Sequence, residues 1–252
     1  MRLLIPILFS LPLASALSGV IRDANAVNNQ VFDYVIVGGG LGGFAVAGRL
    51  SEDPGVTVLV IEAGGDTRQD PVVSDSTQYP NVYGRDDLWW KWRTTDGKEM
   101  MGGKMLGGST GINGMTYTRG QKEQYDALAQ LLGGDSNGGR WTWDGMFAAM
   151  KKAESFSPPN DEQRAKGANY NPDYHGYSGP VQVTFPSKMY GQQMKAFHDV
   201  CATNFSIPHS DDPAGGSAAV VGFVPNVSDH QLVQKTDCRQ STGGSGTAAR
   251  PP

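Results

Sequence analysis

A glycine loop between two apolar runs is the feature that most constrains the fold of this chain. Residues 33–50 read DYVIVGGGLGGFAVAGRL, and five of the six positions from 38 to 43 are glycine. The β-branched run at 31–37 predicts a buried strand, 44–50 predicts a helix, and 56–61 predicts a second buried strand. Strand, loop, helix and strand within about 30 residues form a βαβ unit, so we expect the two strands to be parallel.

The glycines of this loop have the spacing of the dinucleotide-binding fingerprint, Gly38-x-Gly40-x-x-Gly43. Gly38 permits the tight turn, Gly40 lets a diphosphate approach the backbone, and Gly43 lets the helix pack closely on the strand. The helix N-terminus offers N–H groups and a partial positive charge to phosphates. We therefore expect the backbone of Leu41 and Gly42 to belong to the same cofactor site.

An acidic residue follows the second strand at the position that the fingerprint requires. Glu62 ends this strand, and we expect Glu62 and the adjacent Ala63 to belong to the cofactor site. A carboxylate here accepts hydrogen bonds from an adenosine ribose. It disfavours a 2′-phosphate, so NAD or FAD is expected rather than NADP. The alternative for the loop alone is a glycine-rich turn in an unrelated α/β domain.

A second glycine cluster at 102–120, GGKMLGGSTGINGMTYTRG, favours FAD over NAD. An NAD enzyme of this type needs only one glycine loop near its N-terminus, whereas a longer cofactor extends to a second segment. Short polar side chains in this cluster can reach phosphate or ring heteroatoms; they are Ser109, Thr110, Asn113 and Thr116.

At these residues the sequence resembles the glucose-methanol-choline (GMC) oxidoreductases, and most closely their secreted fungal glucose and aryl-alcohol oxidases. The resemblance covers about residues 31–240 and is carried, in the expected order, by YVIVGGGLGGFAVAGRL, VLVIEAGG, DLWWKWRT, GGKMLGGSTGINGMTYTRG, YDAL and RWTWD. It implies an FAD whose ADP half rests on the loop at 38–43 and on Glu62. Lining of the flavin end is implied for Gly108, Ser109, Asn113, Gly114, Met115 and Thr116. Trp92 resembles an aromatic position that often precedes this segment, and packing in the core is the alternative role for it.

The implied reaction is hydride transfer from a small-molecule alcohol to the flavin, followed by reoxidation by dioxygen or another acceptor such as quinone. In the family the catalytic base is a His, paired with a second His or Asn, close to the C-terminus of chains more than twice as long as this one. The four histidines His175, His198, His209 and His230 do not lie in that motif, and surface or structural roles are expected for them. No catalytic residue and no metal ligand is therefore assigned.

The expected fold class is α/β. A Rossmann-like FAD-binding domain, with a parallel sheet and flanking helices, is expected at 31–170, followed by the start of an α+β substrate domain at 171–240 and a flexible tail at 241–252. Between these landmarks we expect loops with short helical turns at 63–98, helices at 121–132 and 145–156, the latter capped by Asp144, and a strand at 179–185. The part of the family that carries the catalytic base has no counterpart here. A truncated or alternatively spliced product is the simplest explanation, followed by an error in the gene model, and exposed apolar faces are then expected. The rival reading is a non-catalytic flavin-binding or regulatory fragment. An NAD-dependent dehydrogenase is disfavoured.

The N-terminus predicts a secreted protein. Arg2 precedes an apolar stretch and a small-x-small site at 14–16, so residues 1–16 are expected to be a cleaved signal peptide. Cys201 and Cys238 then either form a disulfide or remain as two free thiols, and Asn204 and Asn226 fit the N-glycosylation pattern.

Charge and hydropathy exclude two further classes of partner. The net charge is −4, so the chain has no basic field for nucleic acid. Beyond the N-terminal stretch, the sequence has no apolar segment of about 18 residues, so no membrane span is expected.

Overall fold

The computed structural model describes residues 19–134, 139–186, 192–229 and 234–235. The expected signal peptide at 1–16, the tail at 241–252, His230 and Cys238 lie outside these residues. A short helix, η1 (Ala24–Ala26), precedes the first strand.

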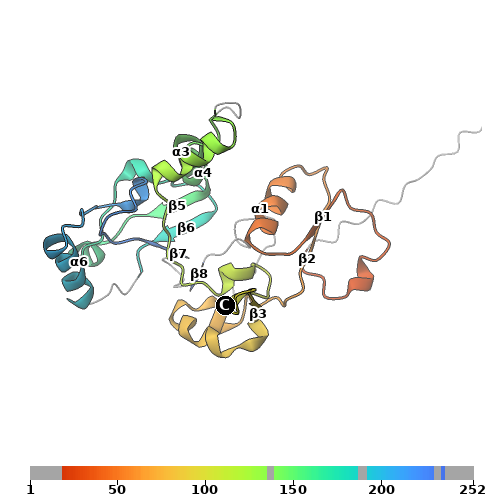
Figure 1. The fold of residues 1–252 in the computed structure, drawn as a ribbon. Coiled ribbons are helices and arrows are strands. Elements are labelled where there is room, and N and C mark those ends of the chain that lie inside the picture. Colours follow the sequence, from red (N-terminus) through yellow and green to blue (C-terminus); the bar gives the residue numbers. More distant parts are fainter. Residues whose placement is uncertain (1–18, 135–138, 187–191, 230–233, 236–252) are drawn as a thin grey trace, which may run out of the picture.

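The predicted βαβ unit is present (Figure 1). It consists of β1 (Tyr34–Val37), α1 (Leu41–Leu50) and β2 (Val58–Ile61), and the two strands are parallel, as expected. The helix begins three residues earlier than predicted, at Leu41. Gly40 is extended, with φ −84° and ψ −169°, so the helix begins directly after it and includes the last glycines of the loop.

Short helices and a hairpin follow β2. The helices are α2 (Pro71–Ser74), η2 (Ser76–Gly84) and η3 (Asp86–Leu88), which agree with the predicted helical turns. Two antiparallel strands then form a hairpin, β3 (Trp89–Arg93) and β4 (Glu99–Gly103). The expectation of loops with only helical turns up to residue 98 is therefore wrong for β3.

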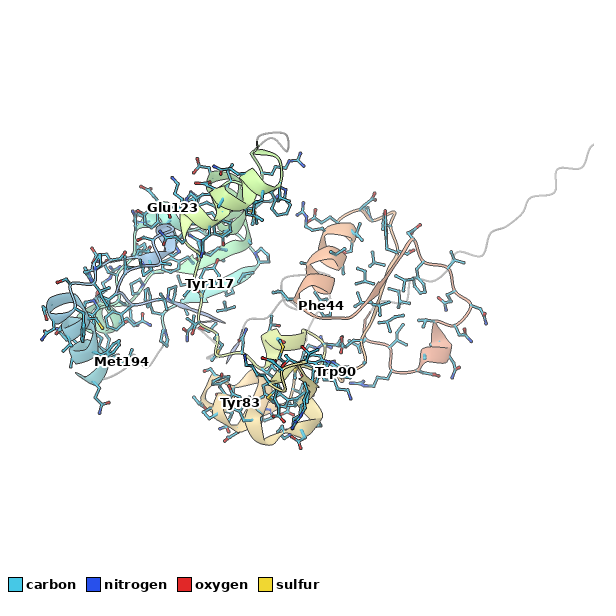
Figure 2. All side chains as sticks on the ribbon, viewed as in Figure 1. Phe44, Tyr83, Trp90, Tyr117, Glu123 and Met194 are labelled. Carbon is cyan, nitrogen blue, oxygen red and sulfur yellow. The ribbon has the colours of Figure 1, made fainter. Side chains whose placement is uncertain are left out.

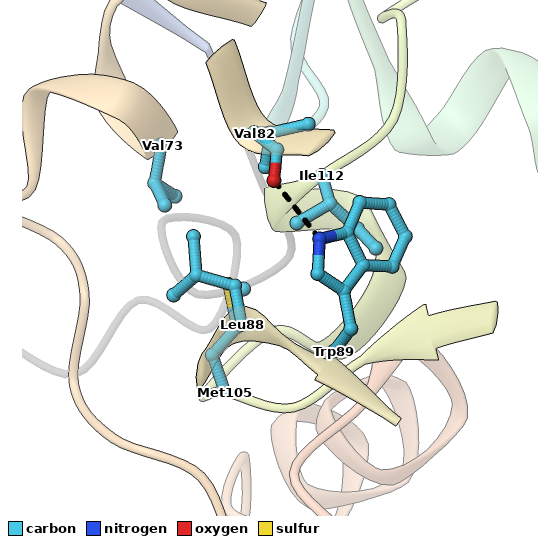
Figure 3. Packing of buried hydrophobic residues seen from close by; sticks show 6 residues of the cluster. All are labelled: Val73, Val82, Leu88, Trp89, Met105 and Ile112. Carbon is cyan, nitrogen blue, oxygen red and sulfur yellow. Dashed lines mark hydrogen bonds between the residues drawn. The ribbon is translucent and has the colours of Figure 1, made fainter. Parts of the chain in front are cut away.

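A hydrophobic core joins these short elements to the second glycine cluster (Figure 3). It consists of Val73, Val82, Leu88, Trp89, Met105 and Ile112, all buried. The indole N–H of Trp89 donates to the carbonyl of Val82 at 2.9 Å, so the largest side chain of this core also satisfies its polar atom. Met105 and Ile112 lie on either side of η4 (Gly108–Gly111) and anchor it to this core.

The remaining elements build a second, mixed sheet. Its strands are β5 (Glu154–Ser157), β6 (Val181–Thr184), β7 (Asn226–Asp229) and β8 (Gln234–Lys235), in that order, with β5 and β6 parallel and the other pairs antiparallel. Phe156, Ala168, Val183 and Phe185 form its core. The helices of this part are α3 (Lys122–Leu131), α4 (Trp143–Ala153), α5 (Asp161–Ala165), η6 (Pro172–Tyr174), α6 (Gln192–Asn204) and η7 (Pro213–Gly215). The expected domain boundary at residue 170 falls between β5 and β6, two paired strands.

The predicted cap and end of the fourth helix are wrong. Thr142, not Asp144, is the N-cap of α4: its hydroxyl oxygen accepts the N–H of Gly145 at 3.4 Å. Asp144 lies within the first turn instead. The helix ends at Ala153 because Glu154 is extended and begins β5. The expected helix at 145–156 therefore extends three residues too far, into β5.

The sheet of β1 and β2 leaves apolar side chains exposed. Val35, Val37 and Ile61 are 52%, 83% and 49% exposed. Within the described part of the chain, no helix has the length and apolar character needed to span a membrane.

Candidate dinucleotide site

The glycine loop at 38–43 and the second glycine cluster at 102–120, called below the first and second glycine segments, contact each other through their backbones. The N–H of Gly107 donates to the carbonyl of Gly39 at 2.7 Å, and a Cβ on Gly108 would lie 2.9 Å from the Cα of Gly40. Gly107 and Gly108 both have positive φ, +94° and +55°. Because a side chain at position 108 would be strained and would collide with the first loop, glycine is required there. Figure 2 labels Phe44, which follows the first glycine segment in α1, and Trp90 of β3, whose partner strand β4 contains the start of the second segment.

The first loop has the geometry that a diphosphate requires. A Cβ on Gly43 would lie 1.9 Å from the carbonyl oxygen of Gly38, so the helix and the turn are packed as closely as the backbone allows. Gly38 itself has φ +102°. In contrast, a Cβ on Gly40 would meet nothing within 4 Å. The space beside Gly40 is open, as the approach of a diphosphate demands.

The start of α1 carries N–H groups without intrahelical partners. Gly40 is the N-cap and has no side chain to cap them, and Leu41 and Gly42 are exposed. The first N–H groups of a helix have no carbonyl partner within it, and the helix dipole places partial positive charge beside them. The residues present therefore fit the diphosphate of a dinucleotide.

The carboxylate of Glu62 holds two backbone amides. Its Oε2 accepts the N–H of Gly39 and its Oε1 accepts the N–H of Gly64, each at 2.8 Å. Each carboxylate oxygen has a second lone pair, so a ribose hydroxyl can still donate to this half-buried side chain. Ala63 beside it is exposed.

The second glycine segment presents polar groups on its surface. Ser109, Asn113 and Thr116 are exposed. The hydroxyl oxygen of Ser109 accepts the N–H of Gly103 at 3.1 Å, and Asn113 Oδ1 accepts the N–H of Met115 at 3.0 Å. Gly114 is exposed, whereas Gly108 and the side chain of Met115 are buried. The side chain of Met115 thus serves packing, and only its backbone, at φ +63°, belongs to the turn.

Trp92 lies beside this segment. Its ring covers Gly102, where an added Cβ would be 2.8 Å from the ring and 3.7 Å from the hydroxyl oxygen of Ser109. The ring also stacks on Trp90, with centroids 6.5 Å apart, and is 51% exposed. Trp92 is therefore a surface residue next to the second glycine segment and not part of the buried core.

Three glycines of this site were not predicted as site residues from the sequence: Gly39, Gly64 and Gly107. Gly39 is buried between Glu62 and Leu106, and a Cβ on Gly64 would lie 2.2 Å from the backbone of Lys104. Their signal in the sequence is the extra glycine beside each motif position, in the runs GGG, EAGG and LGG.

A buried ionic network joins the second sheet to the end of the second glycine segment. Arg119 Nη2 donates to Glu154 Oε2 at 2.8 Å. The ring nitrogens of His175 lie 2.9 Å from Glu154 Oε1 and 2.9 Å from Asp212 Oδ2. Burial by itself lowers the pKa of His175, but the hydrogen bonds to Asp212 and Glu154 raise it, and the net pKa is above the usual 6.5. For Asp212, burial raises the pKa, but the hydrogen bond from His175 and two backbone N–H groups bring it below the usual 3.8.

The other described histidines lie on α6 and on the loop after it. His198 Nε2 and His209 Nδ1 are 3.0 Å apart, and both residues line a pocket of about 440 Å³ together with Arg164 and Lys166. None of these four residues is among the contacts of the glycine segments described above.

Two glycosylation positions and one cysteine lie in the same part of the chain. Asn204 is exposed at the end of α6, whereas Asn226 is half-buried in β7, where it pairs with Thr184. Cys201 is buried on α6. Cys238 lies outside the described residues. A disulfide between the two cysteines and two free thiols therefore both stay as alternatives.

Comparisons with known proteins identify the family. The family model described as GMC oxidoreductase matches residues 32–241. The chain is 37% identical over 214 residues to the glucose oxidase-like protein fsoC of Humicola fuscoatra, covering 82% of this chain and 35% of that protein. It is 34% identical over 216 residues to a glucose oxidase of Penicillium chrysogenum, covering 83% of this chain and 35% of that enzyme.

A solved structure agrees with these relatives. An FAD-dependent oxidoreductase from Chaetomium thermophilum superposes with a TM-score of 0.73 at 28% identity, covering 84% of this chain and 36% of that one. The chain thus spans about a third of the length of the proteins that it matches. The family match covers most of the chain and contains both glycine segments, and the chain belongs to the GMC oxidoreductase family.

Proposed function

We propose that this chain is the FAD-binding part of a secreted oxidoreductase that oxidises an alcohol by hydride transfer to flavin. FAD is the cofactor, and dioxygen or a quinone is the proposed acceptor of its electrons. The observation that carries the proposal is the contact between the two glycine segments, with open space beside Gly40. A single loop would serve a nucleotide, whereas two adjoining segments serve the two halves of a longer cofactor.

The proposed site for the ADP half is the first loop. The amides of Leu41, Gly42 and Gly43 at the start of α1 donate to the diphosphate, and Glu62 accepts from the ribose. The carboxylate disfavours a 2′-phosphate, which agrees with FAD.

The proposed site for the flavin end is the second segment. The backbone of Gly108 and Gly114 allows close approach, and the exposed side chains of Ser109, Asn113 and Thr116 supply hydrogen-bonding groups. When bound, FAD supplies the acceptor for the hydride. Backbone N–H groups of this segment, fixed in place before the reaction, would stabilise negative charge on a bound cofactor, because they need no reorganisation.

The proposal keeps the expected domains, with the FAD-binding part at 31–170 and the start of the substrate domain at 171–240. It also keeps the signal peptide at 1–16 and secretion. Glucose oxidases are among the relatives, which supports an alcohol as the substrate class. We assign no catalytic base to this chain.

The test is to purify the protein from the culture medium of the organism that makes it and to record its flavin spectrum. The expected result is a yellow protein whose flavin is bleached under anaerobic conditions by a sugar or aryl alcohol and restored by dioxygen. A colourless protein would contradict the cofactor assignment, and a flavin that no alcohol bleaches would contradict the substrate class.

A further inference from the structure

Glu62 connects the turns that follow β1 and β2. Its two carboxylate oxygens accept the amides of Gly39, after β1, and Gly64, after β2, both at 2.8 Å. A carboxylate has only acceptors and can satisfy two donors at once, whereas an amide side chain turns its NH₂ group toward one of them. A single side chain thus fixes both turns at the carboxyl end of the sheet.

The first turn passes this connection on to the second glycine segment. Gly39 is buried, its N–H donates to Glu62, and its carbonyl accepts the N–H of Gly107 at 2.7 Å. A Cβ on Gly39 would lie 3.2 Å from the Cβ of Glu62 and 3.3 Å from the side chain of Leu106. The place of Gly107 therefore depends on Glu62 through one residue.

The second turn leads to the same segment. A Cβ on Gly64 would lie 2.2 Å from the carbonyl carbon of Lys104, and the carbonyl of Gly65 accepts the N–H of Leu106 at 3.0 Å. Gly39 and Gly64, whose amides Glu62 holds, therefore both pack against residues of the second glycine segment itself.

We propose that Glu62 is a positioning residue that sets the spacing between the two glycine segments before FAD binds. Its importance for catalysis rests on the proposed function. The role differs from a hydrogen bond to ribose because it operates in the protein without FAD. Glu62 acts through two turns, at Gly39 and at Gly64, and each of these turns contacts the second glycine segment.

A matched control lies at the opposite end of the same two strands. Asp33 Oδ2 accepts the N–H of Thr57 at 2.7 Å and its hydroxyl at 2.6 Å. This carboxylate also connects the two strands, but before β1 and β2 and away from the glycine segments. Asp33→Asn therefore weakens the βαβ unit without touching the contacts of Glu62.

The experiment measures hydrogen exchange in the full chain freed of FAD, for wild type, Glu62→Gln and Asp33→Asn. In Glu62→Gln one of the two amides loses its acceptor. Exchange is expected to be about tenfold faster at the amides of Gly39 and Gly107, or at that of Gly64, equivalent to about 1.4 kcal/mol. In Asp33→Asn the change is expected near Thr57 only. The dissociation constant for FAD is expected to rise about tenfold in Glu62→Gln and less than about twofold in Asp33→Asn.

Unchanged exchange at all three amides, Gly39, Gly64 and Gly107, in FAD-free Glu62→Gln would overturn the proposal, even with weaker FAD binding, because that pattern belongs to a ribose contact alone. If Glu62→Gln does not fold, hydrogen exchange in the FAD-free wild-type chain tests the proposal instead. Its amides at Gly39, Gly64 and Gly107 must then open with one common free energy, and separate values would overturn the proposal. A wild-type chain that binds no FAD would contradict the proposed function and leave the exchange test valid.

Discussion

Gly108 lies directly against Gly40, because a Cβ on Gly108 would be only 2.9 Å from the Cα of Gly40. Two segments far apart in the sequence thus form one glycine-lined surface. On one side of Gly40 is this contact, and on the side where its own Cβ would project is open space. Substitutions at the glycines around this contact therefore separate effects on FAD binding from effects on folding.

Gly40→Val is expected to weaken FAD binding while the chain stays folded. The new side chain enters open space and the backbone, at φ −84°, accepts it, but it occupies the approach of the diphosphate. Loss of charged hydrogen bonds worth about 1.5–3 kcal/mol corresponds to an affinity about ten- to a hundredfold lower. Titration with FAD and urea unfolding check this. Gly84→Val, also in open space but distant from the loop in sequence, is the control; equal FAD affinity in the two variants would contradict the prediction.

Gly43→Ala is expected to lose both FAD binding and stability. Its Cβ would lie 1.9 Å from the carbonyl oxygen of Gly38, so α1 must move away from the turn. Overpacking of this kind typically destabilises by about 1–3 kcal/mol. The adjacent Gly42→Ala meets nothing within 4 Å and is expected to hold or raise the free energy of unfolding, since alanine favours a helix by about 0.8–1 kcal/mol. Urea unfolding measures the free energy of unfolding of both variants. A similar loss of stability in the two would show that the close contact with Gly38 is not the reason why position 43 requires glycine.

The sequence predicted the βαβ unit because each of its parts has a local signal. Two apolar runs, a glycine loop and a following acid are all continuous in sequence, and they specify parallel strands. The hairpin of β3 and β4 lacked such a signal. β4 reads EMMGG, which has low strand propensity, and its pairing with the tryptophan-rich β3 is what makes it a strand.

The two backbone hydrogen bonds of Glu62 and the buried ionic network could not be derived from local patterns. The spacing predicts a ribose contact for Glu62, but the bonds to Gly39 and Gly64 depend on how two turns meet in space. The network brings together Arg119, Glu154, His175 and Asp212 from four separate segments. Thr142 and Asp144 are both good N-cap residues, and only the backbone decides between them.

The stability of the second sheet is expected to fall as pH rises above neutrality. Both ring nitrogens of His175 face carboxylate oxygens, of Glu154 and Asp212, so the charged ring with two N–H groups fits this buried site. Its pKa is raised, so its contribution is fully present below the unfolded value of 6.5 and is lost as pH rises through the folded pKa. The pKa of Asp212 is lowered, so its contribution is lost only below 3.8.

Denaturant unfolding followed from the acidic side of pH 6.5 into the alkaline range measures this profile. Wild type is expected to lose up to about 1.4 kcal/mol per pH unit on the alkaline side, the slope of one proton. His175→Asn is expected to be less stable and to lack this alkaline limb. A wild-type profile that is flat above pH 6.5 would contradict a charged His175.

Trp89→Phe is expected to destabilise the core that holds the second glycine segment. The change leaves the carbonyl of Val82 without the indole N–H and removes buried volume beside Ile112 (Figure 3). The expected loss is about 1–3 kcal/mol. Trp90→Phe, at a side chain 39% exposed, is expected to stay within about 0.5 kcal/mol of wild type. Thermal unfolding of the two variants compares them, and equal losses would argue against the buried hydrogen bond as the cause.

A crystal structure of the full chain with FAD shows whether the two glycine segments form one cofactor site. We expect the diphosphate beside Gly40, at the amides that open α1, and the flavin end along Ser109 to Thr116. Density for FAD that does not reach the second glycine segment would contradict the claim that the two segments form one cofactor site.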